Sequence, residues 1–310
     1  MTTHHSPPPS TRPPSLPHAR FSTLLRPTYV PSSATPPPCH SLRCFSFPRR
    51  SYFFPTKFTM PSAVAAATDD GNELNFPFEL ADESNFDRIV SSDGLMTICG
   101  FGSLLSERSA RSTFPDLINF RVAKLSGFRR VFAHVAPIFF ERGIAKPETK
   151  EISSLSVEPC EGETLIVSIF EIQRSAIPAF IEREHEFRFL AVIPETLNGL
   201  FYINPAVICT RYSDEEYLKN RCKGDKDIFF QRYGRYNIDK IWQDDIFPCR
   251  VYLRHCVLAA QNLGDLAYNN FLDHTFLGDR TTTIRQYLST TGSGIMEEEP
   301  PELLKERYGG

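Results

Sequence analysis

Three glutamates, Glu182, Glu184 and Glu186, alternate along the chain where a helical pattern gives way to an apolar strand pattern. A carboxylate held in a site can take a proton from one reacting group and return it to another, which is general acid–base catalysis. Most glutamates are solvated surface groups, so at most one of the three is expected to be catalytic. Residue types alone leave open which one that would be.

A glycine-bearing turn at 100–103 is a second feature that could do chemistry, because it follows a strand pattern and precedes a helix-like segment at 107–112. Glycine lets a ligand approach the backbone closely, and successive N–H groups at such a turn bind carboxylates or phosphates. Dinucleotide binding would require a third glycine where Leu105 stands. The turn therefore predicts an anion-binding loop, and a tight strand exit without a ligand is the alternative.

Alternating apolar and polar residues predict the short strands that would position these features. Two strands are expected on either side of Gly127, and two more are expected to form a hairpin across the turn at 159–163. Ile177, Phe180 and Ile181 have helical spacing, which predicts a short helix that ends near Glu184. The expected strands are 95–99, 120–125, 128–135, 152–157, 164–172, 187–193 and 206–210.

Beyond residue 211 the pattern becomes helical. Ser213 and Glu216 have the spacing of a capping box, which predicts a helix that begins at Asp214. Two more helices are expected at 252–270 and 281–288. Strands followed by helices indicate the α+β class.

The string Ile-Cys-Gly-Phe-Gly-Ser-Leu-Leu at 98–105 resembles the Tyr-Gly-Ser loop that opens γ-glutamylcyclotransferase-like domains, including the ChaC-type glutathione-degrading branch. Residues 125–132 are similar to the Gly-aromatic-Arg-x-x-Phe strand of that family, and 163–170 resemble its next apolar strand. Residues 180–184 fall where the family keeps its catalytic glutamate. The resemblance covers roughly residues 97–210.

The resemblance implies a carbon–nitrogen lyase in which the free α-amine of a γ-glutamyl peptide or amine attacks its own γ-amide carbonyl. The products would be 5-oxoproline and an amine, and glutathione is one candidate substrate. No metal or cofactor is implied. Glu184 would be the general acid/base. The loop that binds the substrate carboxylate would consist of Phe101, Gly102, Ser103, Leu104 and Leu105.

The sequence departs from the family pattern at Phe101 and Phe187, where tyrosine is usual, so two hydroxyl groups are missing. This departure favours an alternative, a non-catalytic module that binds a small molecule or a partner protein. The fold implied in either case is a mixed, barrel-like sheet over 95–211 with a helical extension packed on it over 212–290. The glutamate-rich tail at 291–310 is expected to be solvated.

The 310-residue chain is 41% hydrophobic and carries a formal charge of −3. Residues 1–67 contain no Asp or Glu and carry +7, so the other residues carry −10. The basic first segment, 1–68, has the composition of a transit peptide for the chloroplast, with the mitochondrion or plain disorder as alternatives. Residues 69–94 are expected to be a linker.

The acidic remainder lacks the basic footprint that nucleic-acid binding requires, so nucleic acid is not an expected partner. No apolar run reaches the ~18 residues of a membrane span, and no cysteine pair has metal-ligand spacing. A small γ-glutamyl molecule is the expected partner. The sequence leaves the oligomeric state open.

Overall fold

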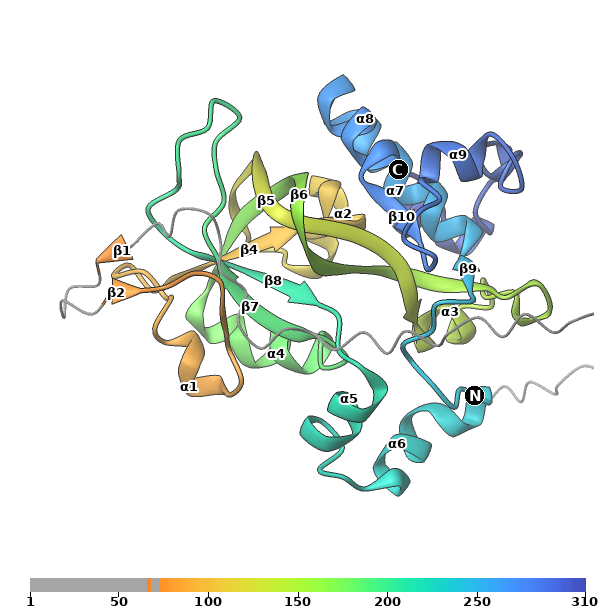
Figure 1. The fold of residues 1–310 in the computed structure, drawn as a ribbon, viewed down its shortest axis with the longest axis horizontal. Helices are drawn as coiled ribbons and strands as arrows, with labels where there is room; N and C mark the ends of the chain where they lie inside the picture. The colour runs from red at the N-terminus through yellow and green to blue at the C-terminus, as the bar shows by residue number, and fades with distance from the viewer. Residues whose placement is uncertain (1–65, 68–72) are drawn as a thin grey trace, which may run out of the picture. The chain divides into compact units, whose positions relative to one another are not determined.

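The computed structural model describes residues 66–67 and 73–310 and is built around an eight-stranded mixed sheet (Figure 1). The strand order is β10-β5-β6-β4-β8-β7-β3, and β9 pairs with β6 beside this path. Pairs β4–β8, β5–β10 and β6–β9 are parallel, and the other pairs are antiparallel. The predicted α+β class with a mixed sheet is confirmed. The strands are β3 (Phe78–Glu79), β4 (Leu95–Gly100), β5 (Ile118–Val135), β6 (Glu151–Gln173), β7 (Arg188–Val192), β8 (Ala206–Thr210), β9 (Phe247–Pro248) and β10 (Thr275–Leu277).

One end of the sheet curls back on itself. Glu195, just after β7, exchanges two backbone hydrogen bonds of 2.8 Å with Lys124 of β5. These bonds join strands that lie four places apart in the sheet order, which gives this end its barrel-like form.

The two longest strands, β5 and β6, replace four predicted shorter ones. The predicted hairpin across 159–163 is wrong, because that segment lies inside β6, where Pro159 pairs with Phe128 of β5. Gly127 has φ +83° and sits at a shift in register between Ser126 and Phe128. A bulge of this kind bends a strand without ending it, which explains why turn residues here do not mark turns.

Ten α-helices surround the sheet in the described residues, and Figure 1 shows α7, α8 and α9 gathered together, apart from α5 and α6. The predicted start of α5 is confirmed, since Ser213 and Glu216 form a capping box. The single helix predicted over 252–270 is wrong, because Gly264, at φ +103°, separates α7 from α8. The helices are α1 (Glu83–Phe86), α2 (Glu107–Thr113), α3 (Pro137–Glu141), α4 (Ile177–Arg183), α5 (Asp214–Asn220), α6 (Lys226–Tyr233), α7 (Arg250–Asn262), α8 (Asp265–Asp273), α9 (Ile284–Leu288) and α10 (Lys305–Tyr308).

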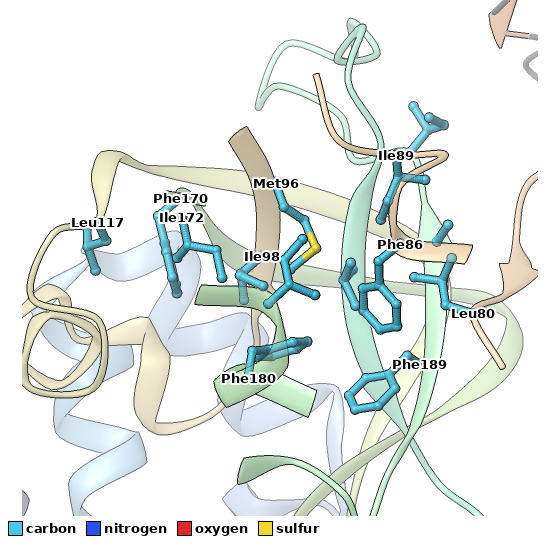
Figure 2. Close-up of a cluster of buried hydrophobic side chains, with 14 of the residues drawn as sticks. Leu80, Phe86, Ile89, Met96, Ile98, Leu117, Phe170, Ile172, Phe180 and Phe189 are labelled. Carbon is cyan, nitrogen blue, oxygen red and sulfur yellow. The ribbon is translucent and has the colours of Figure 1, made fainter. Parts of the chain in front are cut away.

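A hydrophobic cluster packs α1 and α4 against the sheet (Figure 2). Phe86 of α1 contacts the ring of Phe189 of β7, and Phe180 of α4 packs on the same ring. The prediction of a linker over 69–94 is therefore wrong for the part that contains β3 and α1, since that part supplies a strand and core side chains. The sparse apolar pattern of this segment hid its packing, because the buried positions are widely spaced.

The segment 291–310, predicted to be a solvated tail, also packs on the rest of the molecule. Ile295 and Tyr308 are buried, so this prediction is wrong for at least those positions. The predicted transit segment 1–68 lies outside the described residues, apart from β1 (Ala66–Ala67), which pairs with β2 (Glu73–Leu74). No helix in the described residues is long and apolar enough to cross a membrane.

Candidate functional site

A cavity of about 620 Å³ brings the glycine loop and the glutamate segment together. Phe101, Gly102, Ser103 and Leu104 line it from the end of β4, and Glu184 lines it from the end of α4. Helices α3, α6, α7 and α10 supply much of the remaining wall.

Leu105, which the sequence predicts as a fifth loop residue of the site, does not line this cavity. Its side chain is buried in a hydrophobic cluster with Leu253 and Val257 of α7. The short helical turn at Ser103–Leu105 rotates successive side chains by about a third of a turn, so Leu105 points to the core.

Two backbone donors of the loop have no recorded partner within the described residues. Among the hydrogen bonds within the described residues, none uses the backbone N–H of Gly102 or Leu104. Ser168 of β6 holds the loop in place, because its hydroxyl donates to the carbonyl of Leu104 at 2.8 Å. Free N–H groups at a fixed turn are suited to a carboxylate.

Arg130 of β5 supports the loop from inside the molecule. It is fully buried, and its Nε donates to the carbonyl of Phe101 at 2.7 Å. Its other nitrogens donate to Asn270 and to the carbonyl of Ile166. Burial lowers the pKa of Arg130 to about 9. Arg130 is thus a positioning residue that sequence reasoning missed, although strand alternation already implied that only one of Arg129 and Arg130 could point inward.

Tyr252 of α7 brings a hydroxyl to the loop that Phe101 itself lacks. An ideal Cβ placed on Gly102 would lie 2.8 Å from this hydroxyl, so the tyrosine closes directly over the glycine. Burial raises the pKa of Tyr252 well above its ordinary value. The hydroxyl therefore stays protonated and can donate to a bound ligand.

Glu184 caps the end of α4, where its N–H donates to the carbonyl of Phe180 at 3.0 Å. Its Oε1 accepts from Arg183 Nε at 2.8 Å, and its side chain is 20% exposed. The pairing with Arg183 uses one carboxylate oxygen and leaves Oε2 for a ligand in the cavity.

Glu186 lines the same cavity and is more deeply held, although sequence reasoning treated it as a surface neighbour. Its Oε1 accepts from the Tyr233 hydroxyl at 2.8 Å, and its Oε2 lies 2.8 Å from His134 Nε2. This contact is a salt bridge when His134 is protonated. His134 Nδ1 lies 2.6 Å from the hydroxyl of Ser154, its cross-strand partner.

Burial alone would raise the pKa of Glu186, but His134, His185 and the Tyr233 hydroxyl together outweigh burial and hold this pKa below its ordinary value of 4.5. Glu182, the third glutamate, also lines the cavity but is exposed. The available signal for Glu186 was its place in the same short glutamate-rich segment as Glu184. Across the described residues, no three His, Cys, Asp or Glu side chains gather as a metal site would need.

Neither a family model nor a curated protein matches this chain. Solved structures do. An uncharacterized protein from Homo sapiens is 16% identical, with a TM-score of 0.32, over 49% of this chain and 90% of that one. A protein named gamma-glutamyl cyclotransferase has the same identity and coverage, with a TM-score of 0.31. A protein from Arabidopsis thaliana is 12% identical, with a TM-score of 0.30, over 47% of this chain and 93% of that one. At these TM-scores the similarities carry no argument about activity.

Proposed function

We propose that this protein is a γ-glutamylcyclotransferase-like enzyme that releases 5-oxoproline from a γ-glutamyl peptide or amine. The observation that carries the proposal is that Glu184 and the loop at Phe101–Leu104 line the same cavity, although the two are about eighty residues apart in the sequence. The resemblance of both segments to the family supports the same assignment.

The geometry supports a short sequence of proton transfers. The α-carboxylate of the substrate would accept from the free N–H groups of Gly102 and Leu104, which fixes the α-amine near its own γ-carbonyl. Glu184 would take a proton from the α-ammonium through Oε2. The amine then bonds to the γ-carbon, and the C–N bond to the leaving amine breaks. Glu184 gives this proton to the leaving amine and then carries to it the second proton that the α-nitrogen loses, so the products are a neutral lactam and an ammonium ion and protons and charge balance.

Loss of the carboxylate should remove turnover without unfolding the chain. Full-length protein should release 5-oxoproline from at least one of a panel of γ-glutamyl peptides and amines, measured by chromatography. Glu184→Gln should lower kcat by about 10²- to 10⁴-fold, the usual contribution of general acid–base catalysis. Glu215→Gln removes an exposed carboxylate that does not line the cavity, so it is the matched control and should keep its rate. If no compound of the panel releases 5-oxoproline, the proposed activity is wrong. If Glu184→Gln keeps full activity, the assignment of Glu184 as the acid/base is wrong.

A binding module without catalysis is the competing function, favoured by the missing hydroxyls at Phe101 and Phe187. It predicts that γ-glutamyl compounds bind without turnover. The position of the Tyr252 hydroxyl over Gly102 weighs against this alternative, because it restores a donor to the loop.

We propose a plastid location from the composition of residues 1–68. A fusion of residues 1–75 to a fluorescent reporter should enter chloroplasts. A diffuse cytosolic signal would refute the location and would leave the chemistry untouched.

A further inference from the structure

Arginine side chains are concentrated in the wall of the cavity. Arg183 and Arg235 pair there with Glu184 and Glu141. Arg142 and Arg307 line the same cavity with no carboxylate within ion-pair distance among the described residues. Arg232 lines the cavity without a salt bridge as well, and its Nη1 donates to the Tyr217 hydroxyl at 3.4 Å. Guanidinium groups without a counter-charge in a concave site indicate an anionic ligand.

Arg307 is anchored by only one of its nitrogens. Its Nη1 donates to the hydroxyl of Ser112 at 2.6 Å, to the hydroxyl of Ser109 at 3.2 Å and to the carbonyl of Ser109 at 3.0 Å. All of these acceptors are uncharged. Its Nε and Nη2 make no hydrogen bond within the described part of the chain, so two donors remain for a ligand.

Arg142 contacts Tyr308, which is the residue after Arg307 in the sequence. Arg142 Nη1 donates to the Tyr308 hydroxyl, and the guanidinium lies 5.4 Å from the centroid of that ring. Burial lowers the pKa of Arg307, and the nearby charges of Arg183 and Arg142 lower it further. Like charges gathered in this way destabilise one another unless an anion joins them.

Elements other than the donor loop supply this pair, since Arg142 follows α3 and Arg307 lies in α10. Tyr252, whose hydroxyl lies over Gly102, packs in the same small cluster as Tyr308, the residue after Arg307. A ligand that engages both ends needs two anionic groups.

We infer that Arg142 and Arg307 form a second anion subsite that binds a carboxylate on the leaving side of the substrate. The inference rests on the proposed function and narrows its substrate to a γ-glutamyl peptide that ends in a free carboxylate. Guanidinium groups suit this ligand because they donate two parallel hydrogen bonds to a carboxylate. An uncharged γ-glutamylamine would leave the pair unpartnered.

Calorimetry on the full-length chain with two probes tests the subsite directly. The probes are γ-glutamylglycine and its C-terminal carboxamide, which differ only in the second negative charge. The acid should bind about tenfold more tightly or better, as a charge-assisted hydrogen bond allows. In Arg307→Gln and in Arg142→Gln the ratio of Kd values should fall to about twofold or less. Arg285→Gln, which removes an exposed arginine paired with Asp273, is the matched control and should keep the full ratio.

Equal Kd values for acid and amide in the wild-type protein, no binding of either, or an unchanged ratio in both cavity variants would overturn the subsite. Arg307→Lys keeps the positive charge and should retain part of the ratio of Kd values. This variant tests the subsite even if Arg307→Gln does not fold. Turnover is read separately. If the acid binds more tightly than the amide but no 5-oxoproline is released, the proposed function is wrong and the subsite stands. If both probes release 5-oxoproline and have equal Kd values, only the subsite is wrong.

Discussion

At the scale of single residues, the cavity holds two carboxylates in different surroundings. Glu184 is paired with a partly exposed arginine, whereas Glu186 is held by His134 and Tyr233 in the interior. Two carboxylates whose environments differ in this way take different roles. Glu184 is placed to exchange protons with a ligand, and Glu186 is placed to stay ionised and stabilise the wall.

Replacing Glu186 by glutamine should therefore affect stability. Its side chain is 13% exposed, and its two carboxylate oxygens contact His134 and Tyr233, so removing the carboxylate leaves buried polar groups without their partner. We expect the free energy of unfolding at pH 7 to fall by about 3 kcal/mol, measured by urea denaturation. Glu184→Gln, in a more exposed pair, should cost less than about 1 kcal/mol.

The lowered pKa of Glu186 also predicts how the difference in unfolding free energy between wild type and Glu186→Gln depends on pH. The folded pKa of Glu186 is lowered, so its stabilisation is fully present above about pH 4.5 and is lost as the pH falls through the folded value. The gap in unfolding free energy between wild type and Glu186→Gln should therefore shrink between pH 5 and pH 3. A gap that stays constant over this range would show that the ion pair does not stabilise the fold.

At the scale of elements, the donor loop depends on strands and a helix that are distant in the sequence. Arg130 of β5 holds the carbonyl of Phe101, and Tyr252 of α7 covers Gly102. The loop can present N–H groups because these elements fix it before a ligand arrives. Helix α7 is itself anchored by buried residues such as Leu253.

Gly102→Ala should disturb the loop because its new methyl group would meet the Tyr252 hydroxyl at 2.8 Å. We expect Kd for γ-glutamylglycine to rise about tenfold, which is of the order of one lost ligand hydrogen bond. In a Tyr252→Phe background the nearest atom is gone, so the same substitution should have a smaller effect. Equal effects in the two backgrounds would show that the hydroxyl does not close over the loop.

At the scale of the whole molecule, the segment before β4 completes the core that supports the site. Phe86 of α1 is 1% exposed and packs in one cluster with Phe189 and with Phe180 of α4, the helix that ends just before Glu184 (Figure 2). The position of Glu184 thus depends on residues that the sequence pattern assigned to a linker.

Phe86→Ala should lower the free energy of unfolding by about 3–5 kcal/mol, since it removes a buried ring and leaves a cavity. Phe230→Ala is the matched control, because that side chain is 69% exposed and its loss should change stability by less than about 0.5 kcal/mol. Chemical denaturation of both variants measures the difference. Equal, small losses would mean that α1 is not part of the folded core.

The sequence by itself determined the features that depend on near neighbours. The strand at 95–100, the helix after Ser175 and the capping box of Ser213 with Glu216 follow from spacing over a few residues, because helix and strand periods repeat at that range. It also singled out Glu184 and the loop through two short motifs. The structure places both at one cavity.

Only the tertiary structure decided which residues stand around those motifs. The β5–β6 register brings His134 to Ser154, and the packing of α10 brings Arg307 to Ser109, which is 198 positions earlier. The bulge at Gly127 joins what the pattern divided into separate strands. Burial and charge pairing arise from contacts between distant segments, and no local period encodes them. The place of Glu184 at the cavity was therefore predictable from sequence, while Glu186, Arg130 and the arginine pair required the fold.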